Sequence, residues 1–233
     1  MKDFHFKEFS VRQSGQVFRV GTDAVLLGSL ALVHGARNIL EVGTGTGIIS
    51  LMAAQRNSTA QIVAIDIDEE AVHLAQENFS HSPFWERLHA KEADFTLFSA
   101  AKKFDLILSN PPYFAANNSE KDVLARQQKT LTFSTLIEEA AQHLSEDGRL
   151  SVIIPYESGL YFTQKCKEKH LSLQRKITIH GNADAAPKRL ILEFGHSSFS
   201  CVEETFIIEK SPRQYSEQYL EATKAFHVFG DGK

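Results

Sequence analysis

Glu41-Val42-Gly43-Thr44-Gly45-Thr46-Gly47 is the stretch that decides how the rest of the chain is interpreted. An apolar run typical of a strand, residues 39–42, leads into it, and a run with helical composition, residues 48–55, follows. Three glycines at alternate positions allow the backbone to turn tightly and to approach a ligand closely. The first turn of the following helix offers free N–H groups. The sequence therefore predicts a ligand-binding turn between a strand and a helix.

Outward from this turn, short β-rich runs alternate with helical runs. This alternation is typical of an α/β protein with a doubly wound, mostly parallel sheet and helices on both faces. In such sheets the ligand lies outside the carboxyl ends of the strands. We therefore expect site residues where strands end. The expected core strands are 39–42, 61–65, 89–93, 104–109 and 150–154, and the expected core helices are 48–55, 69–79 and 131–144.

Further elements are expected on both sides of this core. Residues 190–194 and 205–208 most simply pair as a C-terminal antiparallel hairpin that closes the far edge of a seven-stranded sheet. At the N-terminus we expect a short β-hairpin and a helix, which Thr22 or Asp23 is suited to cap. The other expected elements are a hairpin of 4–13 with 17–20, helices at 24–32 and 157–170, a strand at 173–179 and a helical tail at 215–229. We expect one domain over 1–233, divided into 1–37, 38–155 and 156–233.

Composition excludes several classes of protein. The chain has 233 residues, 42% of them hydrophobic and 23% charged, with a net charge of −4, which fits one ordinary globular domain and not a strongly basic nucleic-acid binder. The two cysteines, Cys166 and Cys201, and the lack of an apolar leader predict a cytoplasmic, reduced protein. No apolar stretch reaches the ~20 residues of a membrane span, and no histidine pair has metal-ligand spacing. We expect neither a membrane nor a metal.

The spacing of the glycines distinguishes between nucleotide ligands. The dinucleotide fingerprint G-x-G-x-x-G would need glycine at position 48, where this chain has Ile48, which disfavours a dinucleotide oxidoreductase. The observed G-x-G-x-G, with an acidic residue two positions before it, resembles the first motif of class I S-adenosylmethionine (SAM) dependent methyltransferases. The resemblance implies that SAM is the cofactor and that it is bound by the motif residues Glu41, Gly43, Gly45 and Gly47.

Three aspartates follow the next two strands. Asp66 ends the second strand, where a carboxylate can accept hydrogen bonds from both ribose hydroxyls. Asp68 is better explained as the N-cap of the following helix. Asp94 ends the third strand and could accept from the adenine amine of SAM while Phe95 covers the ring. The alternative for Asp94 is an ordinary surface-loop acid.

The fourth strand ends abruptly at Asn110-Pro111-Pro112-Tyr113. The Asn110 side-chain oxygen and the Pro111 carbonyl can both accept from an amino group whose lone pair is otherwise delocalised, which favours methyl transfer to that nitrogen. Pro111 and Pro112 stiffen the turn, and Tyr113 and Phe114 would stack on a flat substrate. We expect these four motif residues to form the catalytic turn, with Asn110 also beside the cofactor. Two prolines that merely end a strand are the alternative.

The glycine turn followed by Asn-Pro-Pro-Tyr resembles the amino-methylating class I methyltransferases. Residues 18–28, residues 187–193 and the tail aromatics Tyr215, Tyr219 and Phe226 are similar to the bacterial tRNA1(Val) (adenine-37-N6)-methyltransferase family. The resemblance implies a Rossmann-like methyltransferase sheet and methylation of adenine N6 in tRNA, at adenine 37 beside the anticodon. It also places Thr22 and Asp23 at the methionine moiety of SAM, with helix capping as the alternative role.

Length and charge distribution bear on the substrate. Only 40 residues precede Glu41 and 78 follow Pro155, which leaves no room for a separate recognition domain and favours a compact RNA with an unpaired target base. Residues 149–233 hold 12 basic and 10 acidic residues, whereas residues 1–148 hold 13 and 19. We expect Lys188 and Arg189 to contact phosphate, with Arg126 and Lys129 as a second candidate pair.

Several alternatives stay open from the sequence. The same chemistry could act on guanine N2 of ribosomal RNA or on a protein glutamine amide. A non-catalytic SAM-fold module that binds RNA is a further alternative, although the intact Asn-Pro-Pro-Tyr turn argues against it. We expect tRNA as the partner of a monomeric protein.

Overall fold

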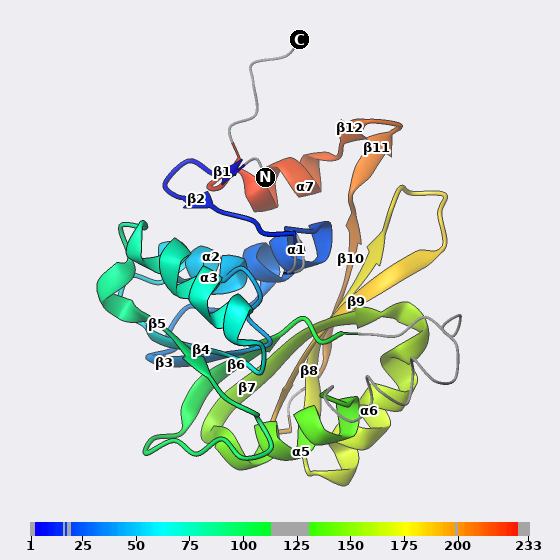
Figure 1. Cartoon of the computed structure of the whole chain (residues 1–233). Coiled ribbons are helices and arrows are strands. Elements are labelled where there is room, and N and C mark those ends of the chain that lie inside the picture. Colours follow the sequence, from blue (N-terminus) through cyan, green and yellow to red (C-terminus); the bar gives the residue numbers. More distant parts are fainter. Residues whose placement is uncertain (1–2, 16, 18–19, 113–130, 199, 228–233) are drawn as a thin grey trace, which may run out of the picture.

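An eight-stranded mixed sheet forms the centre of the computed structural model, which describes residues 3–15, 17, 20–112, 131–198 and 200–227 (Figure 1). Its strands are β3 (Asn38–Val42), β4 (Gln61–Asp66), β5 (Leu88–Glu92), β6 (Phe104–Ser109), β7 (Leu144–Pro155), β8 (Ser172–His180), β9 (Pro187–Gly195) and β10 (Val202–Ile207). Their order is β10-β8-β9-β7-β6-β3-β4-β5. The predicted α/β sheet is thus confirmed.

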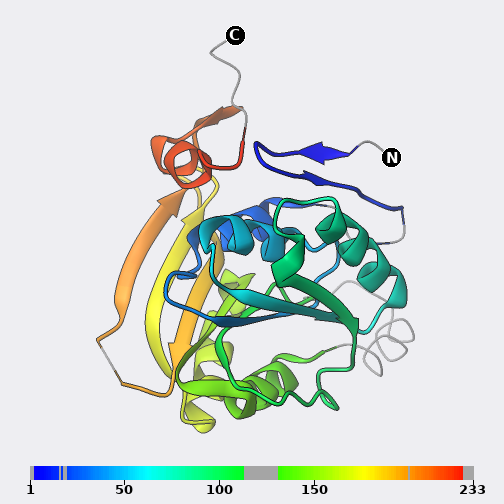
Figure 2. The same cartoon turned by 90° about the vertical axis from the view of Figure 1, so that its left-hand side faces the viewer.

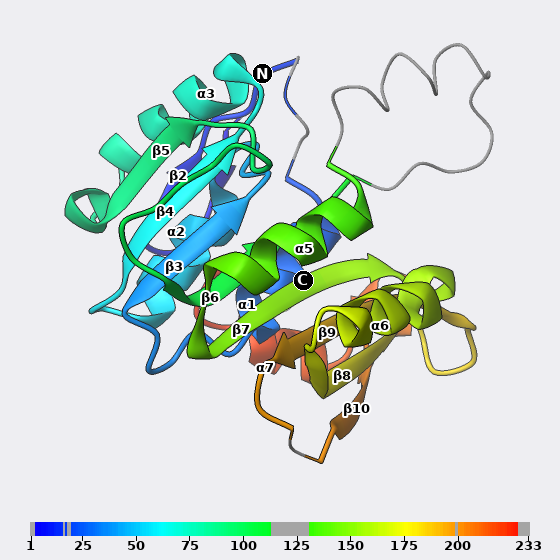
Figure 3. The same ribbon diagram turned by 90° about the horizontal axis from the view of Figure 1, so that it is seen from below.

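Helices cover both faces of this sheet (Figures 1 and 3). One face carries α1 (Thr22–Leu30), α2 (Ile48–Arg56) and α3 (Glu69–Ser80), and the other carries α5 (Phe133–His143) and α6 (Gly159–Glu168). The short α7 (Glu217–Thr223) lies beside the hairpin of β1 (Phe4–His5) and β2 (Ser10–Val11) (Figure 2). The remaining elements are the 3-10 turns η1 (Trp85–Arg87) and η2 (Tyr156–Ser158) and the strand pair β11 (Glu209–Ser211) and β12 (Gln214–Tyr215).

Two apolar cores, one on each face, explain why the central strands are nearly all apolar. In β6, Leu106 and Leu108 belong to the core under α1, α2 and α3, whereas Ile107 belongs to the core over α5 and α6. Successive side chains of a strand point to opposite faces, so a strand buried on both faces needs apolar residues at every position.

The order of the strands reverses between β3 and β6, which places the ligand crevice. β3 pairs in parallel with β4 on one side and with β6 on the other, and Val42 aligns with both Ile65 and Ser109. The Ser109 hydroxyl donates to the Val42 carbonyl at 2.9 Å, so the two strand ends are tied together. Ligands of doubly wound sheets bind at this switch point, outside the carboxyl ends.

The far edge of the sheet differs from the expected hairpin of residues 190–194 with 205–208. Instead, β9 lies antiparallel between β7 and β8, and β10 pairs in parallel with the outer side of β8. The central sheet holds eight strands, where a seven-stranded sheet was expected. The burial of each strand gives the reason. Residues 190–195 of β9 are all buried and need neighbours on both sides, whereas four of the six residues of β10 are exposed, as an edge strand tolerates.

The N-terminal segment also differs from expectation. β1 pairs with β2, Phe4 opposite Val11, so the hairpin lies within residues 4–11 and does not join 4–13 to 17–20. The N-cap of α1 is Gly21, and neither Thr22 nor Asp23 makes a side-chain cap hydrogen bond. The capping role expected for these two residues is therefore wrong.

The carboxyl end of α1 is held by charged side chains from distant elements. Arg56 donates to the Gly28 carbonyl at 2.9 Å, and Arg175 donates to the Leu30 carbonyl at 2.7 Å. The buried Glu193 accepts from the Leu32 amide at 2.9 Å. Cations stabilise the carboxyl end of a helix dipole. These bonds fix α1 to α2 and to the sheet, with its amino end toward the carboxyl edge of the strands.

Gly28 allows the close approach of α1 and α2. A Cβ atom at this position would lie 2.6 Å from the Met52 sulfur and 2.9 Å from its Cβ. Gly28→Ala must push the helices apart and is expected to lower the free energy of unfolding by about 1–3 kcal/mol, as measured by urea denaturation. Ser29→Ala is the control, because the buried Ser29 hydroxyl has no hydrogen-bond partner among the described residues. Equal stability of Gly28→Ala and wild type would contradict this packing.

Candidate functional site

The glycine turn after β3 has the backbone geometry of a ligand cradle. Gly43, Gly45 and Gly47 have φ angles of +78°, +54° and +78°, a region that residues with a side chain rarely adopt. A Cβ atom at Gly43 would meet nothing within 4 Å, and one at Gly45 would meet only Val17 at 3.9 Å. At Gly47 it would lie 2.5 Å from the Phe79 ring. Gly43 and Gly45 thus leave open space above the turn, whereas Gly47 permits helix packing.

A buried carboxylate holds this turn from below. Glu41 in β3 has no exposed surface, and its Oε2 accepts from the Thr44 hydroxyl at 2.9 Å, from the Ser50 amide at 3.1 Å and from the Ser50 hydroxyl. Glu41 therefore joins the strand end, the turn and the first turn of α2. Sequence reasoning identified Glu41 but missed Thr44 and Ser50, because hydroxyl residues in a turn carry no distinctive signal.

A second carboxylate lies on the neighbouring strand end. Asp66 accepts from the Gly45 amide at 2.9 Å through Oδ2 and from the Asp68 amide at 3.1 Å through Oδ1. Burial raises the pKa of Asp66, and the two backbone hydrogen bonds oppose that rise. Asp68 accepts from the Glu70 amide at 3.0 Å, which confirms it as the N-cap of α3.

The loop after β5 starts beside Asp66, since the Ala93 amide donates to the Asp66 carbonyl at 2.9 Å. Asp94 accepts from both the amide and the hydroxyl of Thr96, at 2.9 and 2.7 Å. Phe95 is 3% exposed and packs against Phe98 and His143. In this arrangement Asp94 stabilises its own loop, and the Phe95 ring belongs to the core.

The end of β6 brings Asn110 to the same edge of the sheet as the glycine turn. Its Oδ1 atom is buried and accepts no hydrogen bond from the described residues. A buried acceptor without a donor is costly, so it indicates a place for a donor from a ligand. Pro111 is buried and Pro112 exposed. The predictions for Tyr113, Phe114, Arg126 and Lys129 lie outside the described residues.

An ion pair links the start of α1 to the start of β9. The Arg189 Nε donates to Asp23 Oδ2 at 2.9 Å, and both side chains are partly buried, at 29% and 21% exposure. Thr22 and Lys188 are exposed. Arg189 aligns with Pro155 across the antiparallel pair of β7 and β9, so the start of β9 lies at the edge where β6 and β7 end. No local pattern predicts this pairing, because the two residues are 166 positions apart.

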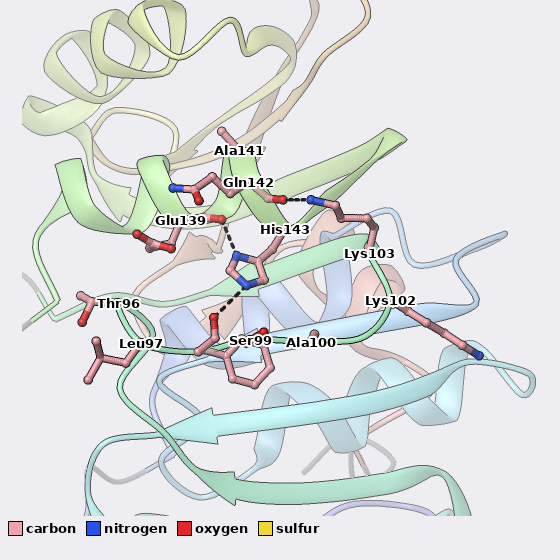
Figure 4. A pocket seen from close by; sticks show the side chains of 11 residues that line it. Thr96, Leu97, Ser99, Ala100, Lys102, Lys103, Glu139, Ala141, Gln142 and His143 are labelled. Atoms are coloured by element: carbon pink, nitrogen blue, oxygen red, sulfur yellow. Dashed lines mark hydrogen bonds between the residues drawn. The ribbon is translucent and has the colours of Figure 1, made fainter.

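A pocket of about 650 Å³ lies elsewhere, between the loop 96–103 and the end of α5 (Figure 4). Its polar groups bond to one another: His143 contacts the Glu139 and Phe98 carbonyls, and Lys103 donates to the Gln142 carbonyl.

The described residues hold no cluster of three metal-ligating side chains, nor, in the same ranges, a helix long and apolar enough to cross a membrane.

Comparisons with known proteins identify the family of this chain. Residues 14–169 match the model of the methyltransferase small domain family. The chain belongs to this family. A tRNA1(Val) (adenine(37)-N6)-methyltransferase from Flavobacteriaceae bacterium (strain 3519-10) is 56% identical over 98% of this chain and 100% of its own length. A relative of the same name from Bacteroides thetaiotaomicron is 37% identical, over 97% of each chain.

Solved structures show the methyltransferase fold. A predicted O-methyltransferase from Agrobacterium tumefaciens superposes with a TM-score of 0.70, at 20% identity, over 88% of this chain and 96% of its own. A putative RNA methyltransferase from Pyrococcus horikoshii has a TM-score of 0.55 at 18% identity, over 82% of this chain and 91% of its own. Membership of the small domain family implies SAM-dependent catalysis.

Stability should depend on the protonation of Glu41. Burial raises the pKa of Glu41 to about 7, against hydrogen bonds from Ser50 and Thr44 that lower it, and the charge of Asp66 adds to the rise. The folded state therefore binds this proton more tightly than the unfolded chain. The resulting stabilisation is fully present below the ordinary value of 4.5 and is lost as pH rises to about 7.

Glu41→Gln should remove this dependence. As pH rises from 4.5 to about 7, the free energy of unfolding of the wild type should fall relative to that of the variant. The expected fall is on the order of 3 kcal/mol. Urea unfolding at a series of pH values measures the difference. Glu92→Gln, which removes an exposed carboxyl at the end of β5, controls for the loss of a charge. Parallel pH profiles for wild type and Glu41→Gln would refute the assignment.

Proposed function

We propose that this protein methylates the N6 amino group of adenine 37 in tRNA1(Val), in the cytoplasm, with SAM as methyl donor. The observation that carries the chemistry is the buried Asn110 Oδ1 at the carboxyl edge of β6, beside the glycine turn, which accepts no hydrogen bond from the described residues. The substrate is supported by the relatives named tRNA1(Val) (adenine(37)-N6)-methyltransferase, which match along nearly the whole chain.

The residues at this edge suit SAM. Gly43 and Gly45 leave open space for a ligand and present backbone amides to it, and Asp66 can accept from ribose hydroxyls. Asp94 and Phe95 are assigned to the adenine end, and Thr22 and Asp23 to the methionine end. Glu41 holds the turn in place through Thr44 and Ser50. When bound, SAM supplies a methyl group that its sulfonium sulfur has already activated.

Asn110 and Pro111 orient the accepting nitrogen. An adenine amino group conjugated to its ring is a poor nucleophile, because the lone pair is delocalised. Hydrogen bonds from that NH₂ to the Asn110 Oδ1 and the Pro111 carbonyl hold the nitrogen in place and favour the positive charge that develops on it. No general base is required before transfer, because the nitrogen loses its proton afterwards. Tyr113 and Phe114 are assigned to stacking on the base.

RNA binding at this edge is assigned first to Lys188. Lys188 is exposed at the start of β9, beside the paired Arg189, which we expect to serve both Asp23 and the RNA. Arg126 and Lys129 are further candidates for phosphate contact. A guanine N2 in ribosomal RNA, a protein glutamine amide and a non-catalytic RNA-binding role remain as outcomes of the assay.

Asn110→Ala should separate chemistry from cofactor binding. Turnover is expected to fall by about 100-fold or more, because the acceptor for the amino group is lost, while SAM affinity by calorimetry stays near wild type. The assay supplies labelled SAM with separate pools of tRNA, ribosomal RNA and release-factor protein. Label in N6-methyladenosine of tRNA is expected, and label only in guanosine or in protein would refute the substrate. The control is Asn38→Ala, because Asn38 is the first residue of β3 and lies at the amino end of that strand, away from the site.

Lys188→Ala should weaken RNA binding through one phosphate contact. The slope of log affinity against log salt concentration is expected to decrease in magnitude by about 0.7–0.9, as for the loss of one released counterion. Fluorescence anisotropy with labelled tRNA measures it. Lys102→Ala, in the exposed loop before β6, should leave the slope unchanged. An unchanged slope in Lys188→Ala would remove Lys188 from the RNA interface.

A further inference from the structure

Three large apolar side chains are exposed together just after β7. Tyr156 in η2 is 45% exposed, and Leu160 and Tyr161 in the first turn of α6 are 84% and 49% exposed. Elsewhere in the described part of the chain, exposed large hydrophobic residues occur singly along the sequence. Single exposed apolar residues are ordinary, whereas a group of them indicates an interaction surface.

This group lies on the rim of the proposed active site. Val152 aligns with Ser109, so β7 continues past the level of Asn110 before it ends at Pro155 and leads into η2. The first residues of α6 sit directly on the start of β9, since a Cβ atom at Gly159 would lie 2.3 Å from Leu190 Cδ1. Tyr156, in η2 directly after β7, therefore lies beside β9, which carries Lys188 at its start.

The surface is held rigidly by the residues around it. The next residue in α6, Phe162, is fully buried and packs against Phe133 and Phe194, with ring centroids 5.2 and 5.7 Å away. The Tyr161 hydroxyl lies 3.2 Å from the Ser134 hydroxyl, and the Lys165 ammonium lies 6.0 Å from the centre of the Tyr161 ring. The ring is thus oriented in advance while about half of the side chain remains exposed.

Most basic charge in this part of the chain is already paired. Of the seven basic residues between positions 160 and 190, five have a carboxylate within ion-pair distance: Lys165 with Glu168, Lys169 with Glu138, Arg175 with Glu193 and Glu204, Lys176 with Glu203, and Arg189 with Asp23. Paired cations attract phosphate less than free ones do. An RNA bound along residues 160–190 therefore needs contacts other than charge.

We propose that Tyr156, Leu160 and Tyr161 form a stacking surface for unpaired nucleotides that flank the target adenine. This inference rests on the proposed function. Proteins recognise single-stranded RNA loops by stacking splayed bases on exposed aromatic rings, whatever the sequence of the bases. The surface lies beyond the level of Asn110, so it fits neighbours of the reacting base and not that base itself. Unlike phosphate contacts, stacking releases no counterions, so its contribution to RNA affinity should not vary with salt concentration.

Alanine and phenylalanine variants distinguish stacking from other roles. Tyr156→Ala and Tyr161→Ala are each expected to weaken binding of an anticodon stem-loop RNA by about 5- to 100-fold, with SAM affinity and melting temperature near wild type. Tyr156→Phe keeps the ring and should bind as wild type, and Tyr161→Phe, which keeps the ring but loses the contact with Ser134, should lose less affinity than Tyr161→Ala. Leu160→Ala should have a smaller effect of the same kind. Trp85→Ala is the matched control, since Trp85 is 57% exposed in η1, at the opposite edge of the sheet.

The salt dependence supplies the second readout. The slope of log affinity against log salt concentration should be unchanged in both tyrosine-to-alanine variants, whereas Lys188→Ala should reduce it. Wild-type RNA affinity in both alanine variants, with tRNA methylation intact, would overturn the stacking surface and leave the proposed function standing. If the alanine variants sediment differently from the wild type but bind RNA with unchanged affinity, the surface would be a contact between protein copies, and the stacking proposal would be equally overturned. Failure of the wild type to methylate tRNA would overturn the function itself.

Discussion

The buried carboxylate of Glu41 is the interaction on which the rest of the site depends. One of its two oxygens, Oε2, accepts hydrogen bonds from both the turn and the start of α2, so the strand, the turn and the helix are joined at one atom. The adjacent Asp66 binds the middle of the same turn from the next strand. Asn78 in α3 supports it from behind by donating to the Thr46 carbonyl at 2.9 Å. Side chains thus hold the glycines, which have no rigidity of their own, in one conformation.

The sequence predicted the central part of the fold well, because its signals are local. The bounds of β6 agree with expectation to the residue, since Phe104–Ser109 is an apolar run between a lysine pair and Asn-Pro. Asp68 was recognised as a cap because capping depends only on the next few residues. The far edge was mispaired because partner choice depends on which strand needs two neighbours. Periodicity alone did not reveal that residues 190–195 of β9 are all buried, whereas four of the six residues of β10 are exposed.

The site was predictable where residues follow strand ends and unpredictable where they pair across the fold. Asn110 and Asp66 could be found because the carboxyl ends of parallel strands share an edge. The bond between Asp23 and Arg189 could not, because it depends on β9 running opposite to β7. Residues 160–190 contain seven basic side chains, but their number in the sequence does not reveal the carboxylates that pair with five of them.

The reversed direction of β9 has a consequence for how this fold can diversify. In an all-parallel sheet, each loop on the ligand side leads from a strand into a helix and is constrained by that crossover. Because β9 is antiparallel, the connection 181–186 between β8 and β9 is a plain hairpin loop on the ligand side. Residues can be inserted there without lengthening a helix or disturbing either core. Substrate range can therefore change at this loop independently of the cofactor half of the molecule.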